Sequence, residues 1–452
     1  MKKSKFQQLL ADGYGSALVF LKSTASPMDY ARQIEYCCTH DTCFDMQSEG
    51  DRADYLFGAI SLTGQENYFL ERIMHRLERK HNLFDWECRQ MLRIIVLYRR
   101  NDFPEAERFL DSLYERSLDR LLTGKHTEKR SDEFEELCIF LSDEDVSYFV
   151  RTVSRIGKYL TEYPLSDVFS LDYFYMRFLD INGKAYSRKL LENVPKEYVK
   201  AFDKAFYDSD FYWLSRSSRK KNAKRPCPSF ERLTECLNGN ENIEKKRMLT
   251  KIFAIFSDES ELKRLAELML SEKDEKKKLI MLDAFDVKPF PLDSGIIFDM
   301  FDSGSKEVRE ALFYAMCHIT DNDELVKKYA SEELSGACED PELAAAALNA
   351  YISKSRKNDA AYLLSVLKNG NFDKYSLHQL FGEIQKAYDR FPTRKARDIL
   401  MYIYEHQSCT VCRYDLIRTM SKCRCLTDEI LNEAVSDANP DTRVYAEKRL
   451  RK

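Results

Sequence analysis

Apolar residues at helical spacing recur along the C-terminal half of this 452-residue chain, and they constrain its fold more than any other feature. One stripe runs from Met248 to Phe256 and another from Leu343 to Tyr351, each with apolar residues at positions i, i+1, i+4, i+5 and i+8. Residues at this spacing lie on one face of an α-helix. Because such a face must pack against another helix, the pattern predicts an all-α protein.

The stripes return at intervals that suit pairs of helices. Each follows a turn rich in Asp, Ser, Asn or Pro, and successive helix starts are separated by 31, 31, 35, 51 and 48 residues. Repeats of this length indicate helix pairs that bury their apolar faces only against their neighbours. We therefore expect an α-α superhelix, or α-solenoid. The helix starts are Glu244, Glu275, Lys306, Pro341, Pro392 and Pro440.

Two segments strengthen this interpretation. SKEVREALFYAM at residues 305–316 and ANPDTRVYAEKRL at residues 438–450 each place a polar or proline turn before a helix start of the Val-Arg-x-x-Ala kind. They resemble the second helix of HEAT repeats, which belong to the armadillo-like superfamily. The resemblance implies a HEAT-like solenoid. The residues that carry it are Val308, Arg309, Ala311, Pro440, Arg443 and Ala446.

Five positions form the expected repeat signature. Arg247, Arg309 and Arg443 each stand three residues after a helix start. Pro341 and Pro440 stand at helix openings, where the missing N–H has no intrahelical partner to lose.

The same pattern of polar turns followed by apolar stripes is weaker in the N-terminal half. We predict a divergent HEAT-like helical block over residues 1–207, a basic loop or hinge over 208–240, and HEAT-like repeats over 241–452. The hinge prediction rests on the loss of apolar periodicity and on two prolines, Pro226 and Pro228.

The hinge also carries a concentrated positive charge. Six cations fall within ten residues without an acidic residue among them, and Trp213 lies just upstream. Cations beside aromatic rings are typical of single-stranded nucleic-acid binding, whereas a solvated loop is the other interpretation. If the nucleic-acid-binding protein were also an enzyme, it would resemble the HEAT-like DNA glycosylases. Trp86 and Trp213 reproduce none of the motifs of those enzymes, so we expect both to be core or interface residues. The six cations are Arg216, Arg219, Lys220, Lys221, Lys224 and Arg225.

Two Cys/His clusters raise the question of zinc. One spans residues 37–43 and the other spans 406–425, with a C-x2-C pair at Cys409 and Cys412. Their spacing matches no known zinc finger or ribbon. Cys409 and Cys412 also continue a helical stripe through Leu416 and Met420, which is typical of small buried residues. We therefore predict no bound metal and no cofactor, with zinc at 406–425 as the open alternative.

Composition narrows the function further. The 71 basic and 75 acidic residues nearly balance, so only a local patch would attract nucleic acid or an acidic membrane. The odd number of cysteines, 13, suits free thiols in a reducing cytoplasm, and no apolar run is long enough for a signal peptide or membrane span. The usual catalytic motifs are missing. We expect a cytoplasmic, non-catalytic scaffold that binds a protein partner through its concave face, with nucleic-acid binding as the alternative.

Overall fold

The computed structural model describes residues 1–80, 86–123, 128–163, 171–206, 228–335, 340–451, and these residues contain helices only. They form 27 α-helices and two short 3-10 helices, and no strand occurs in these ranges. The all-α class predicted from the stripes is therefore confirmed. No helix in the described part of the chain is both long and apolar enough to cross a bilayer.

The described residues divide into two compact units. Unit 1 holds residues 1–206 together with 433–444, and unit 2 holds residues 228–432 together with 445–451. Each unit has its own hydrophobic core. The last two helices, α27 and α28, each contribute residues to both units.

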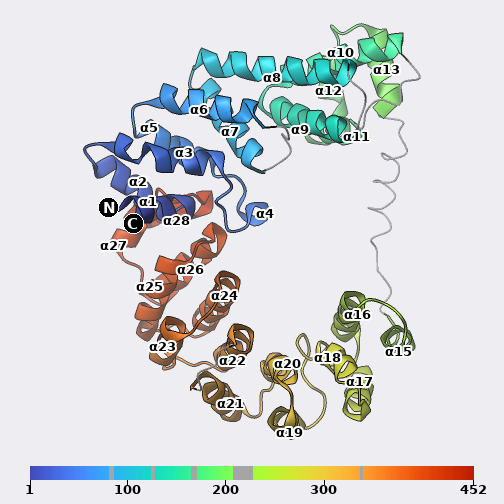
Figure 1. The fold of residues 1–452 in the computed structure, drawn as a ribbon, viewed down its shortest axis with the longest axis vertical. Helices are drawn as coiled ribbons and strands as arrows, with labels where there is room; N and C mark the ends of the chain where they lie inside the picture. Colours follow the sequence, from blue (N-terminus) through green and yellow to red (C-terminus); the bar gives the residue numbers. More distant parts are fainter. Residues whose placement is uncertain (81–85, 124–127, 164–170, 207–227, 336–339, 452) are drawn as a thin grey trace. The chain divides into compact units, whose positions relative to one another are not determined.

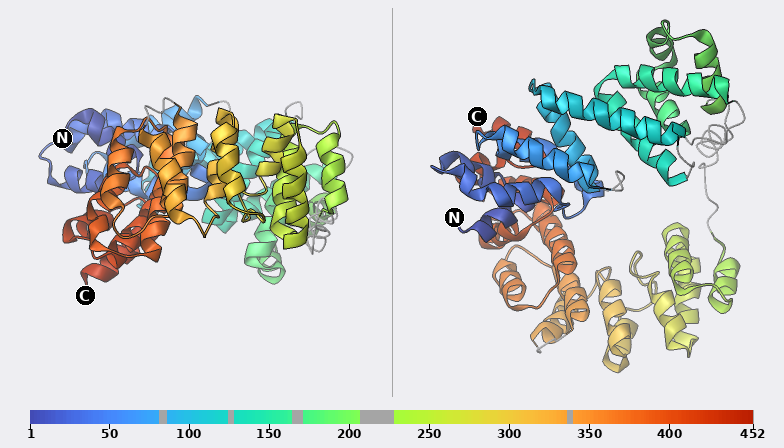
Figure 2. Two further views of the ribbon diagram at one scale, coloured as in Figure 1. Left: turned by 90° about the horizontal axis from the view of Figure 1, so that it is seen from below. Right: turned by 45° about the horizontal axis from the view of Figure 1, so that its top comes forward.

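The described residues of unit 1 form thirteen α-helices before the C-terminal segment joins it. From α5 to α10 each helix packs against the next one in the chain, whereas α10 packs most extensively against α13; these are the blue to green ribbons of Figure 2. Its helices are α1 (Lys3–Ala11), α2 (Gly15–Ser23), α3 (Ala31–Thr39), α4 (Met46–Glu49), α5 (Ala53–Ser61), α6 (Glu66–Glu78), α7 (Trp86–Arg100), α8 (Pro104–Thr123), α9 (Glu128–Glu144), α10 (Val146–Glu162), α11 (Asp172–Asn182), α12 (Lys184–Leu190) and α13 (Lys196–Phe206), with the 3-10 helix η1 (Pro27–Tyr30) before α3.

The C-terminal segment completes unit 1 by a close backbone approach. The amide of Ala438 donates a hydrogen bond to the carbonyl of Gly13 over 2.9 Å. Gly15, the first residue of α2, packs so tightly that an added Cβ would lie 1.8 Å from the carbonyl oxygen of Glu433. Glycine is required there because any side chain would collide with backbone. The local sequence pattern did not predict this long-range contact.

Unit 2 has two layers of helices, as Figure 1 shows. Helices α16, α18, α20, α22, α24 and α26 form one layer, each packed against the next in that series, and α15, α17, α19 and α21 pack on its other side. The helices are α15 (Phe230–Asn238), α16 (Ile243–Phe256), α17 (Glu259–Ser271), α18 (Glu275–Leu282), α19 (Gly295–Ser303), α20 (Lys306–Met316), α21 (Asp323–Ser335), α22 (Pro341–Ser353), α23 (Ala360–Asn369), α24 (Lys374–Arg390), α25 (Arg397–His406), α26 (Thr410–Lys422), α27 (Asp428–Ala434) and α28 (Pro440–Leu450), with η2 (Arg394–Ala396) before α25.

The polar turns that repeat in the sequence are helix N-caps. The side chain of Asn242 accepts a hydrogen bond from the amide of Lys245 over 2.8 Å at the start of α16. Asp258 does the same at α17, and Asp340 and Asp373 do so at α22 and α24. Such caps satisfy amides that have no partner within the helix. Pro341 occupies the first position of α22, as the sequence predicts.

The range predicted as a loop is partly helical. Residues 207–227, which include most of the predicted hinge, lie outside the described residues. Helix α15 begins at Phe230, inside the predicted 208–240 range, because Ser229 caps it and Leu233 and Leu237 bury one face. The prolines and basic residues just before this short amphipathic helix are typical of a loop, so the sequence pattern did not indicate the helix.

Candidate binding groove

A groove with a volume of about 1000 Å³ runs along one layer of unit 2. It is lined by residues from α16, α18, α20, α22 and α24, and from the turns that follow α18 and α20. Since each of these helices packs against the next one in this layer, the groove crosses all five helices and is open along its length. A groove of this form can receive an extended or helical segment of another chain.

Helix α20 shows how the sequence builds the groove. Glu307, Glu310 and Tyr314 are separated by three and four residues, so they share one face, and this face lines the groove. Leu312 and Met316 lie on the opposite side, fully buried in the core of unit 2. The apolar stripe therefore fixes the orientation of the helix, and the groove residues follow from it.

Two ion pairs stand at one end of the groove. Arg247 of α16 donates two hydrogen bonds to the carboxylate of Asp283, over 2.7 and 3.1 Å. Lys251, one turn further along α16, donates to Asp286 over 2.6 Å. Both pairs join α16 to the turn after α18, and they neutralise two of the groove's three cations.

The rest of the groove carries an excess of negative charge. Its lining contains six carboxylates and three cations, and two of the cations are held in the two ion pairs. Glu383 pairs with Lys386 of its own helix over 2.6 Å, so Lys276 is the lining cation that remains opposite Glu307, Glu310 and Glu342.

Glu310 is the most perturbed of these carboxylates. Burial, followed by the charge of Glu342, raises its pKa above the usual carboxyl value. The neighbouring cations Arg247 and Lys306 are already paired, with Asp283 and Asp340 respectively. In the described residues no cation forms an ion pair with Glu310. Its carboxylate therefore loses hydration without gaining a partner.

An aromatic residue lies beside this carboxylate. Burial, with the charge of Glu310, raises the pKa of Tyr314 to about 12, so its phenol stays protonated and can donate a hydrogen bond. Tyrosine combines apolar area with a polar tip, which makes it a frequent anchor for bound peptides. The groove thus offers negative charge around an aromatic contact.

Comparisons with known proteins gave no match: no family model, no curated protein and no solved structure is significantly similar to the chain. No family is identified. Functional arguments for this chain rest on its own residues.

Unit 1 has a smaller cavity of about 480 Å³ among α11, α12 and α13. Its walls include Leu179, Leu191 and Val199. The phenol of Tyr175 in its lining already donates a hydrogen bond to Asp203. Two polar groups of this cavity are therefore already paired with each other.

The predicted signature arginines do not share one role. Arg247 lines the groove, whereas Arg309 of α20 pairs with Glu333 of α21 over 2.9 Å. Arg443 donates to the carbonyls of Asp437 and Ala438 over 2.8 and 2.9 Å, closing the turn before α28. Pro440 begins that helix.

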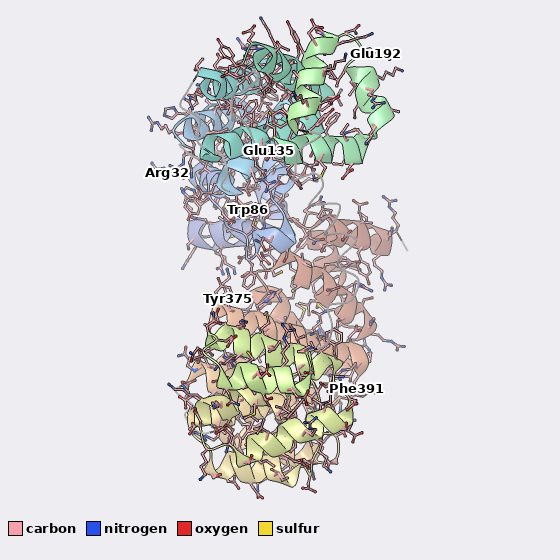
Figure 3. The ribbon with its side chains drawn as sticks, turned by 90° about the vertical axis from the view of Figure 1, so that its right-hand side faces the viewer. Arg32, Trp86, Glu135, Glu192, Tyr375 and Phe391 are labelled. Atoms are coloured by element: carbon pink, nitrogen blue, oxygen red, sulfur yellow. The ribbon has the colours of Figure 1, made fainter. Side chains whose placement is uncertain are left out.

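The predicted nucleic-acid residues lie outside the described residues. They are Trp213, Arg216, Arg219, Lys220, Lys221, Lys224 and Arg225. The other tryptophan, Trp86, stands at the start of α7 and is labelled in Figure 3. Its side chain is 39% exposed, and the Arg89 guanidinium lies 5.0 Å from the centre of its ring. Trp86 is therefore a surface residue, which contradicts the core position expected from the sequence; the interface position, the other expectation, stays a prediction.

The predicted Cys/His cluster at 406–425 separates into different places. The exposed His406 ring stacks on Tyr402, and the thiols of Cys423 and Cys425 donate to the carbonyls of Tyr388 and Arg394. Cys409 and Cys412 come together with a histidine outside the predicted cluster, His378.

Sequence reasoning missed the main groove residues for a simple reason. Apolar stripes locate the helices, whereas the polar positions between them have the same pattern on a solvent-exposed face as on a face that lines a groove. Glu307, Glu310 and Tyr314 have the spacing of a second, polar face on α20. That spacing is the signal that could have identified them.

Proposed function

We propose that this chain is a non-catalytic binding protein that receives a basic segment of a protein partner in the groove of unit 2. The observation that carries the proposal is the half-buried carboxylate of Glu310, which lies beside Glu342 without a cation. A Lys or Arg from a partner would relieve the repulsion between the two carboxylates and form a partly desolvated ion pair. Such pairs contribute more than exposed ones because solvent screens them less.

The groove's shape favours a peptide over a small molecule. Its volume of about 1000 Å³ stands at the upper end of small-molecule pockets, which are about 300–1,000 Å³. It is also open along five helices instead of enclosed. Among the residues that line it, no Ser, Cys or Asp is hydrogen-bonded to a histidine side chain in the manner of a catalytic pair. A binding role therefore explains the groove better than catalysis does.

The architecture that suits this role is a HEAT-like α-solenoid. Three features support it: alternate helices of unit 2 form one continuous layer, capped polar turns recur between them, and that layer carries the groove. Solenoid proteins commonly bind extended partners along the layer of second helices.

The proposal is tested by fluorescence anisotropy with labelled oligolysine and oligoglutamate peptides of equal length. We expect the wild-type chain to bind oligolysine only, and more weakly as salt rises, because the Debye length falls from about 10 Å at 0.1 M to about 3 Å at 1 M. The double variant E310Q/E342Q should bind oligolysine about tenfold more weakly, equivalent to about 1.4 kcal/mol.

The matched control is E267Q/E324Q. It changes the net charge equally, at exposed positions of α17 and α21 outside the groove. Its affinity should equal that of the wild type. Equal losses in both double variants would show general charge attraction instead of a groove, and equal binding of the two peptides would contradict the proposal outright.

A further inference from the structure

We propose that His378, Cys409 and Cys412 form a metal site in unit 2 for zinc or an ion of similar preference. Their donor atoms all lie within 4.8 Å of one another. The closest two are Nε2 of His378 and Sγ of Cys412, 3.1 Å apart. The site is separate from the acidic groove, and it does not depend on the peptide-binding proposal.

Two packed helices hold the three donors. Cys409 is the N-cap residue of α26, and Cys412 lies in the first turn of that helix. His378 lies in the second turn of α24, which packs against α26. The backbone of two regular elements therefore fixes the donor positions.

The distances suit a single ion. Zinc lies about 2.3 Å from a thiolate sulfur and about 2.0–2.1 Å from an imidazole nitrogen. Two ligands of one ion are therefore no more than about 4.6 Å apart, so small side-chain rotations bring all three donors to bonding distance. Thiolates are soft ligands and imidazole is a borderline one, so this donor set selects zinc or copper(I) over magnesium or calcium.

The ligand number indicates an accessible ion. Structural zinc sites usually have four protein ligands, whereas three protein ligands leave one tetrahedral position for water or an outside ligand. Cys409 is buried, but His378 and Cys412 are each partly exposed, so an ion can enter from the surface. We infer a site that exchanges its metal, not a permanently enclosed one.

Other cysteines in the chain differ from this cluster. Cys38 and Cys138 are fully buried in the core of unit 1, and burial raises the pKa of both thiols. These are packing residues. A thiol–imidazole pair for nucleophilic catalysis would need only His378 and Cys412. The presence of a second thiol, Cys409, within the same cluster is what favours a metal ion.

Cobalt(II) titration of the reduced, chelator-washed full-length chain tests the site. We expect one cobalt per chain, with the thiolate-to-metal charge-transfer absorption of a tetrahedral complex, and displacement by zinc. H378A and C412A should each weaken cobalt binding at least tenfold, and zinc should raise the melting temperature of the wild type but not of these variants. Circular dichroism checks that the variants keep their helices.

The control is H406A, an exposed histidine of the sequence cluster that the structure places outside the site. It should bind cobalt as the wild type does. Failure of the reduced wild type to bind cobalt, equal loss in H406A, or full binding by H378A would each overturn the proposal. The proposal would also be overturned if the reduced chain bound no cobalt and Cys409 and Cys412 readily formed a disulfide.

Discussion

Glu310 is a residue whose position costs the protein stability. Burial and the neighbouring charge of Glu342 raise its pKa above the usual carboxyl value. The folded chain therefore holds a proton on Glu310 in a pH range where the unfolded chain has released it. Stability from this group falls as pH rises from about 4.5 through the raised pKa, because the native state binds more protons there.

The variant E310Q should therefore be more stable than the wild type at pH 7, while it binds oligolysine more weakly. Glutamine keeps the shape but has no charge to desolvate. Urea unfolding of both proteins from pH 4 to pH 8 measures this, and the gain should shrink toward pH 4. A loss of stability in E310Q at pH 7 would mean that Glu310 has a structural role. Opposite effects on stability and binding are typical of functional residues.

Lys354 is a buried charged residue whose hydrogen bonds hold parts of the chain together. Only 6% of it is exposed, and its ammonium donates hydrogen bonds to the carbonyls of Cys317, over 2.8 Å, and Ile319. These carbonyls belong to the C-cap and the turn just after α20, near the partial negative charge of the helix end. Burial lowers the pKa of Lys354, but its hydrogen bonds are made within the chain. It therefore leaves no group for a partner to satisfy, in contrast to Glu310.

At the scale of the element, the sequence predicts where helices begin, because local residues determine this. Five of the six helix starts expected in the C-terminal half coincide with a helix start to within one residue, at α16, α18, α20, α22 and α28, because stripes and caps lie within a few residues of each helix. The sixth, Pro392, is wrong: no helix begins there, and η2 and α25 begin only at Arg394 and Arg397. Stripes and caps do not show which helices pack against each other. His378 and Cys412 are 34 residues apart and meet only because α24 packs on α26. The metal cluster therefore could not be assembled from spacing alone.

The start of α2 gives an element-scale prediction. G15A should destabilise the chain by about 1–3 kcal/mol, because the new Cβ would lie 1.8 Å from the carbonyl oxygen of Glu433 and the backbone would have to move. Urea denaturation measures the change. The control is G58A in α5, where the nearest atom is Leu18 Cδ1 at 3.7 Å. Alanine there should be neutral or stabilising, since it suits a helix better than glycine. Equal stabilities for the two variants would contradict the close packing of the C-terminal segment.

At the scale of the whole molecule, the sequence predicts the all-α class but not the membership of each unit. Residues 433–444 belong to unit 1, although they are more than 400 positions from Gly13 and Gly15, which they contact. The groove has a different origin. It lies within unit 2 and is lined by five helices of one layer, including the face of α20 that carries Glu307, Glu310 and Tyr314. That face was readable in principle from the sequence, whereas the closure of unit 1 was not.

The central claim is that the charge of the groove selects its partner, and charge reversal tests it most directly. The measurement is the affinity of E310K/E342K for oligolysine and for oligoglutamate by fluorescence anisotropy. We predict that the preference reverses, so that this variant binds oligoglutamate and no longer binds oligolysine, while E267K/E324K keeps the wild-type preference. An unchanged preference for oligolysine in E310K/E342K would contradict the claim.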